Sequence, residues 1–301
     1  MTGVETGPVP TGMVMTDRRR QRSQGRDFVR RILKSTPGRI GALIILCMAL
    51  IAFAAPLLAP YDPYEIDVPN RLQGPSAQHF FGTDQTGRDV FSRILYGSQL
   101  SLRVGLVAVA IALIIGVPMG LVAAYYGGIV DQIIMRIIDI MLAFPGFLLA
   151  LAVIAMLGPS LTNSMLAVGI GSSTGFARIV RGSVLSLKEN DYVMAARVVG
   201  ATDRRIMRVH ILPNALSPII VLATLEIPVA ILIAAGLSFL GLGAQPPSPE
   251  WGAMLVDGRL FMQTAPWMIT FPGLAIFMTV LGFNLFGNAI RDALDPRLQQ
   301  R

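Results

Sequence analysis

The sequence has little charge and almost no cysteine. Only 14% of its 301 residues are Asp, Glu, Lys or Arg, whereas an average soluble domain has about a quarter. Cys47 is the only cysteine, which excludes a disulfide-stabilised secreted domain. The residues Ala, Val, Ile, Leu, Met, Phe, Trp, Tyr and Cys make up 53% of the chain, which excludes a disordered protein. These proportions indicate a membrane protein with several spans.

Signatures of catalysis, nucleotide binding and metal binding are also missing. The chain has no G-x-x-x-x-G-K-[ST] phosphate loop, no H-E-x-x-H and no C-x-x-C. Its two histidines, His79 and His210, are expected on opposite sides of the membrane, where they make a poor metal site. We therefore expect no catalytic residue, no cofactor and no metal. Any energy that drives the protein must therefore come from a gradient or from a partner protein.

Long uncharged runs predict six membrane-spanning helices. A helix needs about 20 apolar residues to cross a hydrocarbon core of about 30 Å. The sequence G-P-S at 158–160 divides the longest run, as a turn between antiparallel helices would. The expected fold class is an all-α polytopic membrane protein. The predicted spans are residues 40–59, 102–124, 136–157, 162–180, 214–241 and 267–290.

The distribution of Lys and Arg predicts which way the chain faces. An even number of spans puts both termini on one side, which carries 20 of the 25 Lys and Arg residues, against four on the other side. Arg136 is assigned to the basic side, in the loop between the second and third spans. Because cytoplasmic segments are enriched in Lys and Arg, we expect both termini in the cytoplasm. The net charge of +7 therefore reflects orientation in the bilayer rather than a nucleic-acid-binding surface.

This orientation divides the chain into regions. The basic tail is expected to be a solvated segment or to form a short amphipathic helix around Phe28, Ile32 and Leu33. The regions are a cytoplasmic tail (1–39), a first helix (40–61), an extracytoplasmic segment (62–98), a core of five helices (99–291) with a cytoplasmic loop (188–213), and a second cytoplasmic tail (292–301).

The loop between the fourth and fifth spans has an internal order that indicates a docking element. Asp191 can cap a short helix, and Gly200 can end it in a left-handed conformation. Thr202 or Asp203 can then cap a second helix. A short helix with a sharp end suits insertion into a groove of another protein. The candidate docking residues are Asp191, Ala195, Ala196, Arg197, Gly200, Ala201, Arg204, Arg205 and Pro213.

The pattern in this loop resembles the coupling-helix motif of ABC importer permeases. The resemblance rests on A-A-x-x-x-G at 195–200 and on I-L-P at 211–213. The family motif begins with Glu, which Met194 replaces here, and His210 stands where the family has Ile. The resemblance implies that the loop docks on a cytoplasmic ATPase. An ordinary cytoplasmic linker is the alternative.

A longer motif narrows the resemblance to one subfamily. Residues 81–93 read F-G-T-D-Q-T-G-R-D-V-F-S-R and resemble the signature of the C-type permease subunits of dipeptide and oligopeptide importers. The runs L-S-F-L-G-L-G at 237–243 and R-D-A-L-D-P at 291–296 also resemble that subfamily, over residues 40–297 in all. The motif residues singled out are Gly82, Thr83, Asp84, Gly87, Arg88 and Asp89.

The resemblance implies a type I ABC importer permease fold in the plasma (inner) membrane of a prokaryote. Such a subunit is no enzyme: it pairs with a homologous B-type permease, binds two cytoplasmic ATP-binding subunits, and receives its solute from an extracytoplasmic substrate-binding protein. A di- or oligopeptide is the implied solute, although the subfamily extends to nickel, glutathione and haem importers. A gradient-driven secondary transporter is the alternative, but it would usually show internal repeats and buried ionisable residues.

Polar residues inside two spans are candidates for the translocation path. Ser172, Ser173 and Thr174 lie in the fourth span, where small polar residues either line a cavity or let helices pack closely. Glu226 is the one carboxylate well inside a span, and such a group is costly unless it faces a cavity or a partner. A neutral, hydrogen-bonded Glu226 is the alternative. Four prolines lie inside predicted spans, where each frees a backbone carbonyl and can kink its helix: Pro118, Pro145, Pro228 and Pro272.

Overall fold

Helices form all the regular structure in the part of the chain that this computed structural model describes, residues 30–294. Within those residues there is no strand, only one isolated antiparallel bridge between Thr83 and Asp89. Residues 1–29, which include Phe28 and most of the predicted basic tail, and the last seven residues lie outside the described range, whereas residues 30–34 are helical, with Ile32 buried and Leu33 exposed. The helices are α2 (Thr36–Leu58), η1 (Val68–Asn70), α3 (Val90–Tyr126), α4 (Gly128–Leu142), α5 (Gly146–Leu157), α6 (Leu161–Leu187), α7 (Asp191–Val198), α8 (Asp203–Arg205), η2 (Ile206–Ile211), η3 (Leu212–Ala215), α9 (Leu216–Phe239), α10 (Trp251–Arg259) and α11 (Trp267–Leu294).

Four helical segments are long and apolar enough to cross a membrane: α2, α3, the segment Asp203–Phe239 that ends in α9, and α11. The bent pair α4 and α5 can supply a fifth span. Helix α6 has 27 residues, but its Ser, Thr and Gly residues and the charges of Arg178 and Arg181 make it less apolar. The all-α membrane class is confirmed, whereas six spans stay a prediction.

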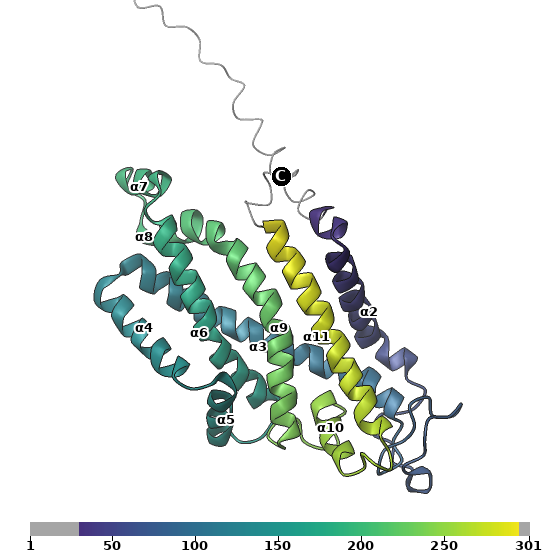
Figure 1. The fold of residues 1–301 in the computed structure, drawn as a ribbon. Helices are drawn as coiled ribbons and strands as arrows, with labels where there is room; N and C mark the ends of the chain where they lie inside the picture. The colour runs from purple at the N-terminus through teal and green to yellow at the C-terminus, as the bar shows by residue number, and fades with distance from the viewer. Residues whose placement is uncertain (1–29, 295–301) are drawn as a thin grey trace, which may run out of the picture.

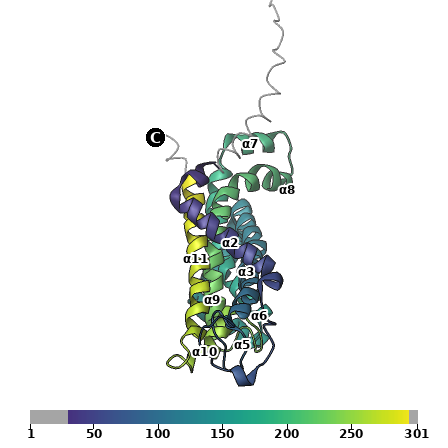
Figure 2. The same ribbon diagram turned by 90° about the vertical axis from the view of Figure 1, so that its right-hand side faces the viewer.

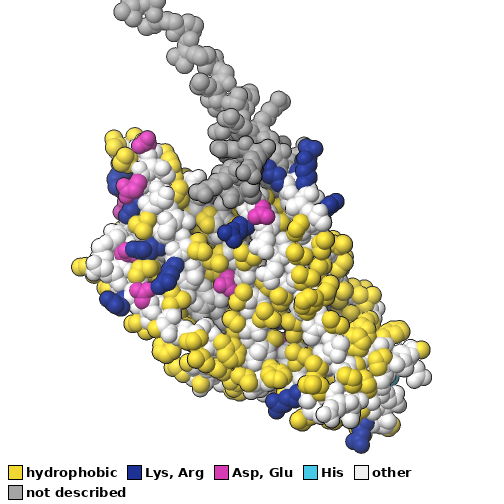
Figure 3. Space-filling model, viewed as in Figure 1, with side chains coloured by type: hydrophobic (Ala, Val, Ile, Leu, Met, Phe, Trp, Pro, Cys, Tyr) yellow, Lys and Arg dark blue, Asp and Glu magenta, His cyan; other side chains and the backbone are white. Residues whose placement is uncertain are grey.

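The long helices run side by side and leave distinct elements at their two ends (Figure 1). The start of α2, the end of α11 and helix α7 lie at one end, and α10 lies at the other. In the side view, α7 lies beyond the ends of the long helices, and α8 lies beneath α7 at one side of them (Figure 2). Hydrophobic side chains dominate the middle of the face in Figure 3, and most Lys and Arg residues gather toward its ends. This distribution is typical of a bilayer-spanning body.

The third predicted span is wrong as a single helix. Residues 136–157 are divided between α4 and α5, which meet at an angle of 94°. Pro145 precedes the first residue of α5; it has no N–H to donate, and it disfavours helical geometry at Phe144. Arg136, expected in a loop, lies within α4, because only Gly127 separates α3 from α4.

Two helices start earlier than their uncharged runs. Helix α3 begins at Val90 because the Asp89 side chain accepts a hydrogen bond from the backbone N–H of Ser92. Residues 90–98, expected in the extracytoplasmic segment, are therefore the first turns of α3. Helix α2 begins at Thr36, where Ser35 accepts a hydrogen bond from the N–H of Gly38. The capping side chains of Asp89 and Ser35 therefore set the first residues of α3 and α2, and a hydropathy pattern does not detect such caps.

Helices α3 and α6 approach closely at two glycines. A Cβ atom at Gly116 would lie 2.3 Å from the carbonyl oxygen of Ser173, and one at Gly120 would lie 2.3 Å from that of Ala177. The buried Phe176 and Val180 of α6 join the same apolar cluster as residues of α3. Because glycine has no side chain, Gly116 and Gly120 allow the backbones of α3 and α6 to approach closely, as in other pairs of membrane helices.

We predict that Gly116→Ala destabilises the chain. The added methyl group forces α3 and α6 apart, and overpacking of this kind costs about 1–3 kcal/mol. The control is Gly182→Ala in α6, where an added Cβ meets no atom within 4 Å. Thermal unfolding of the purified protein in detergent is the measurement, and equal melting temperatures for the two variants would contradict the packing argument.

Candidate functional site

The predicted docking loop folds as a short helix with a well-defined end. Helix α7 covers Asp191–Val198, and Gly200 follows it with φ +81°. The N–H of Gly200 donates to the carbonyl of Arg197, and the N–H of Ala201 donates to that of Ala196. This is the Schellman arrangement, and it needs the left-handed conformation that glycine adopts without strain. The role of Gly200 in ending the helix is confirmed.

Helix capping in the loop differs from the prediction at both starts. Asn190, not Asp191, occupies the N-cap position of α7, and Asp191 is the first helical residue. There its carboxylate still lies near the positive end of the helix. Thr202 precedes α8 but forms no side-chain capping bond. The Asp203 carboxylate instead accepts a hydrogen bond of 2.6 Å from the Tyr125 hydroxyl, which ties the loop to the end of α3.

Apolar contacts anchor α7 to the body of the molecule. Val193 and Ala196 are buried in the cluster that also contains Ile206 and Ile211. The same cluster includes Val184 of α6, so it continues from the loop into the long helices. The side of α7 that faces away from this cluster is open: Val198 and Val199 are 86% and 83% exposed. Helix α7 is therefore packed onto η2, and the same apolar cluster continues into α6 and α9.

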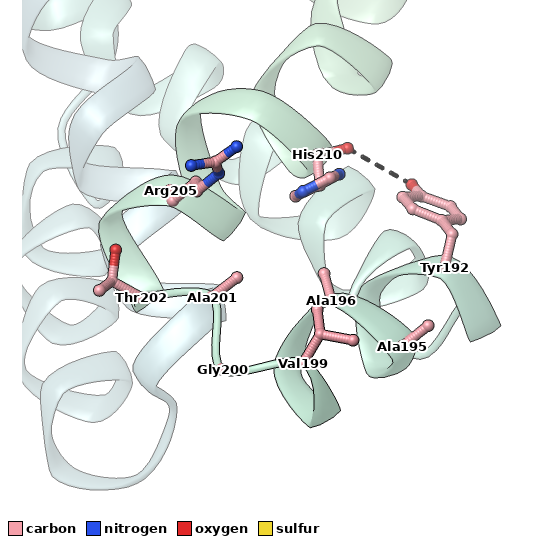
Figure 4. A pocket seen from close by; sticks show the side chains of 9 residues that line it. All are labelled: Tyr192, Ala195, Ala196, Val199, Gly200, Ala201, Thr202, Arg205 and His210. Atoms are coloured by element: carbon pink, nitrogen blue, oxygen red, sulfur yellow. Dashed lines mark hydrogen bonds between the residues drawn. The ribbon is translucent and has the colours of Figure 1, made fainter.

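A cavity of about 600 Å³ separates α7 from the helix that follows it. Figure 4 shows residues of α7 and of the connecting turn on one side, and Arg205 and His210 on the other. Tyr192 closes one edge, since its hydroxyl lies 3.5 Å from the carbonyl of His210 and 3.3 Å from the Asn214 amide. The cavity is lined by Tyr192, Ala195, Ala196, Val199, Gly200, Ala201, Thr202, Arg205 and His210.

The predicted docking residues occupy different positions in this arrangement. Ala196 is packed inside, whereas Ala201 is half-buried. The other seven are exposed to solvent at this end of the molecule: Asp191, Ala195, Arg197, Gly200, Arg204, Arg205 and Pro213. Five of the nine candidates line the cavity beside α7, so the structure brings much of the motif to one surface: Ala195, Ala196, Gly200, Ala201 and Arg205.

The motif predicted to be extracytoplasmic forms a buried ionic network at the opposite end of the molecule. The Asp84 carboxylate accepts a hydrogen bond of 2.6 Å from Nε of Arg88 and others from the backbone of Thr86 and Arg88. The guanidinium groups of Arg88 and Arg93 lie 3.4 Å and 3.7 Å from the Asp257 carboxylate of α10. Asp84, Arg88 and Arg93 are each at most 5% exposed. Two carboxylates thus neutralise two buried cations and join α3 to α10.

The other motif residues hold the segment before α3 in place. The Asp89 carboxylate lies 2.9 Å from Nδ1 of His79, in addition to capping α3. The carbonyl of the buried Thr83 accepts a hydrogen bond from Trp267 of α11. Gly87, with φ +85°, has no room for a side chain, because a Cβ there would lie 1.8 Å from the carbonyl oxygen of Asp67. Gly82 is also left-handed, with φ +75°.

The four candidate path residues are not equivalent. Ser173 and Thr174 are buried and donate their hydroxyl protons to backbone carbonyls of their own helix, α6. Ser172 is half-buried on a more open side of α6. Glu226 in α9 is half-buried, and its Oε2 atom has no hydrogen-bond partner among the described residues. Ser172 and Glu226 are thus only half-buried as residues, although the Oε2 atom of Glu226 is itself buried.

Comparison with known proteins identifies the family. A family model described as the binding-protein-dependent transport system inner membrane component matches residues 116–300, and one described as the N-terminal TM domain of oligopeptide transport permease C matches residues 23–75. The chain belongs to the family of ABC importer permeases. Members are transport components, and ATP hydrolysis resides in partner ATPase subunits.

Relatives within this family are similar over nearly the whole permease. The chain is 51% identical to the dipeptide transport system permease protein DppC of Alkalihalophilus pseudofirmus, over 97% of this chain and 96% of that protein. It is 49% identical to the glutathione transport system permease protein GsiD of Pectobacterium atrosepticum, over 92% and 93%. Its fold resembles that of a chain of the MetNI methionine ABC transporter in an inward-facing conformation, with a TM-score of 0.54, 20% identity, and coverage of 67% and 96%.

One buried carboxylate of the permease escaped the sequence analysis. Glu250 precedes α10, is 3% exposed, and accepts hydrogen bonds from the N–H of Ala253 and the hydroxyl of Ser101 in α3. Burial raises its pKa above the ordinary value for Glu. An acidic residue just before a helix is a recognisable N-cap signal, but its burial against α3 is visible only in the structure.

We predict that Asp84→Ala destabilises the extracytoplasmic end. Removal of one partner of a buried ion pair costs about 3–5 kcal/mol, because Arg88 and Arg93 keep their charges without it. The matched control is Glu65→Ala, which removes an exposed carboxylate from the same segment. Thermal unfolding and limited proteolysis of the segment are the measurements. A variant as stable as the control would refute the network's structural role.

A second prediction concerns pH. Because the pKa of Glu250 is raised in the folded chain, the folded state holds this proton more tightly than the unfolded state. Its contribution to stability is therefore present at low pH and is lost as pH rises through the raised pKa. Glu250→Gln keeps an acceptor for the cap and removes this dependence. The melting temperature of the variant should fall less than that of wild type between about pH 4 and pH 8, and parallel curves would contradict the assignment.

Proposed function

We propose that this chain is one permease subunit of an ATP-driven importer of di- or oligopeptides or a peptide-like solute. The solute class follows the relatives, whose names specify a dipeptide and glutathione. The coupling role rests on one observation above all. Helix α7 projects beyond the long helices, ends at Gly200, and is packed through Val193 and Ala196 onto their common apolar cluster.

Coupling through α7 is mechanical. An ATPase that closes on ATP displaces α7, and the contacts of Val193 and Ala196 transmit the displacement to α6 and α9. Lys188, at the end of α6, donates a hydrogen bond to the carbonyl of Ala124, and Tyr125 bonds to Asp203, so α3 follows the same movement. Two packed arrangements of these helices would open the path alternately to each side.

The cytoplasmic side is the end that carries α7 and both described chain ends. Its support is the gathering of Lys and Arg there, which favours a cytoplasmic location. Helix α6 then crosses the membrane as the sixth span, with its polar face turned away from lipid. The buried ionic network holds a rigid extracytoplasmic cap to α3, α10 and α11, suited to receive a solute-binding protein.

The path runs along the side of the chain where Ser172 and Glu226 are half-buried. It is completed by a homologous B-type permease, because one chain supplies only half of its wall. The unpaired Oε2 atom of Glu226 is suited to accept a hydrogen bond from the ammonium group of a peptide or from the second permease.

The decisive experiment is transport. The chain, its permease partner, the two ATP-binding subunits and the binding protein are reconstituted in liposomes, and uptake of a labelled dipeptide is followed with and without ATP. We expect uptake that depends on ATP and not on an ion gradient. Competition by glutathione separates the two solute classes named by the relatives, and uptake that persists without ATP would refute the proposal.

The coupling role has its own prediction. Gly200→Val places a β-branched residue at a left-handed position, which costs about 1–3 kcal/mol and distorts the end of α7. We expect loss of ATPase association and of uptake. Gly158→Val is the matched control, because Gly158 also has a left-handed φ, +87°, and open space, but follows α5 rather than α7. Equal effects of the two variants on ATPase association would contradict the role of α7.

A further inference from the structure

The cavity beside α7 is lined by one arginine and one histidine and by no carboxylate. Arg205 and His210 are its basic residues, and the rest of the lining is apolar or neutral. Arg205 is exposed and forms no ion pair with any residue in the described range. The neighbouring Asp203 carboxylate is held by the hydroxyl of Tyr125 and does not line the cavity. The cavity therefore carries positive charge that is not neutralised within the chain.

The surroundings have the same sign. Residues 188–213 contain five Lys and Arg against three Asp and Glu. Arg204 and Arg208 are exposed beside the cavity, and Met194 on the open side of α7 carries no charge. The rim is apolar, since Val199 is 83% exposed. A surface of this kind favours a partner that presents a carboxylate within an apolar contact.

The volume of the cavity is also typical of a binding pocket. Its volume of about 600 Å³ lies within the range of roughly 300–1,000 Å³ for binding pockets. Arg205 can bind a carboxylate through two parallel N–H bonds, and His210 can add a further donor. Because Val193 and Ala196 hold α7 against the segment that carries Arg205, the two walls are positioned before any partner arrives.

We propose that this cavity receives an acidic side chain of the ATP-binding subunit. The contact is then reciprocal: α7 inserts into the ATPase, and the ATPase inserts an Asp or Glu between α7 and the helix behind it. Such a carboxylate would hold α7 from both sides, so that pulling as well as pushing motions reach the permease. This inference rests on the proposed function, since it names the chemistry of the partner at the same site.

The chain itself offers a selective test. Its only lysines are Lys34 and Lys188, so a carbodiimide, which joins amines to carboxylates, has few competing targets. Arg205→Lys places an amine at the cavity, and Arg204→Lys and Arg208→Lys are matched controls at exposed positions outside its lining. Each variant is treated in the complex with its ATP-binding subunits, and the linked peptides are identified by mass spectrometry. We expect several-fold more coupling to an Asp or Glu of the ATPase from Arg205→Lys than from either control.

Charge reversal supplies a second readout. Arg205→Glu should weaken ATPase binding about tenfold or more, because two carboxylates would then share a poorly solvated contact, whereas Arg208→Glu should have a smaller effect. Equal coupling from the three lysine variants, or unchanged binding of Arg205→Glu, would overturn the inference. If the wild-type chain does not bind the ATPase, the proposed function itself fails. If it binds but shows no preference at position 205, only the inference about the cavity fails.

Discussion

The close packing of α3 against α6 is the contact on which both ends of the molecule depend. Helix α3 has 37 residues, and a helix of that length extends about 55 Å at 1.5 Å per residue. Its first turns belong to the buried network of Asp84 and Arg93, and its last residues bond to the docking loop through Tyr125. Helix α6 leads directly into α7. Because Gly116 and Gly120 allow these two helices to touch, the two functional ends are mechanically continuous.

The two ends are built on different physical principles. The end that contains Asp84, Arg88 and Arg93 is held by buried charges whose partners all lie in the chain, and such a network tolerates little displacement. The end that carries α7 is held by apolar contacts, and Arg204, Arg205 and Arg208 there form no ion pair with any described residue. An end whose charged side chains are all paired within the chain is suited to stay rigid. An end with unpaired charged side chains is suited to bind another protein.

The sequence predicted the parts of the fold that depend on local chemistry. Uncharged runs located most helices within a few residues, and Gly200 marked the end of α7, because a left-handed position selects glycine. Boundaries set by side-chain caps were missed: Asp89 starts α3 well before the apolar run begins. The sequence analysis also predicted one helix where the structure has α4 and α5 at an angle of 94°, although it noted that Pro145 could kink this span.

The sequence by itself determined that the chain is an all-helical membrane protein with a short helix that ends at Gly200, because hydropathy, charge distribution and turn residues act within a few positions of one another. Only the tertiary structure decided which polar residues are available. Ser173 and Thr174 are buried by α6 packing, while Ser172 and Glu226 are not. It also brought Arg205 opposite α7 to form a cationic cavity and buried Glu250 against α3. Exposure and pairing depend on which distant segments meet, and no local pattern encodes that.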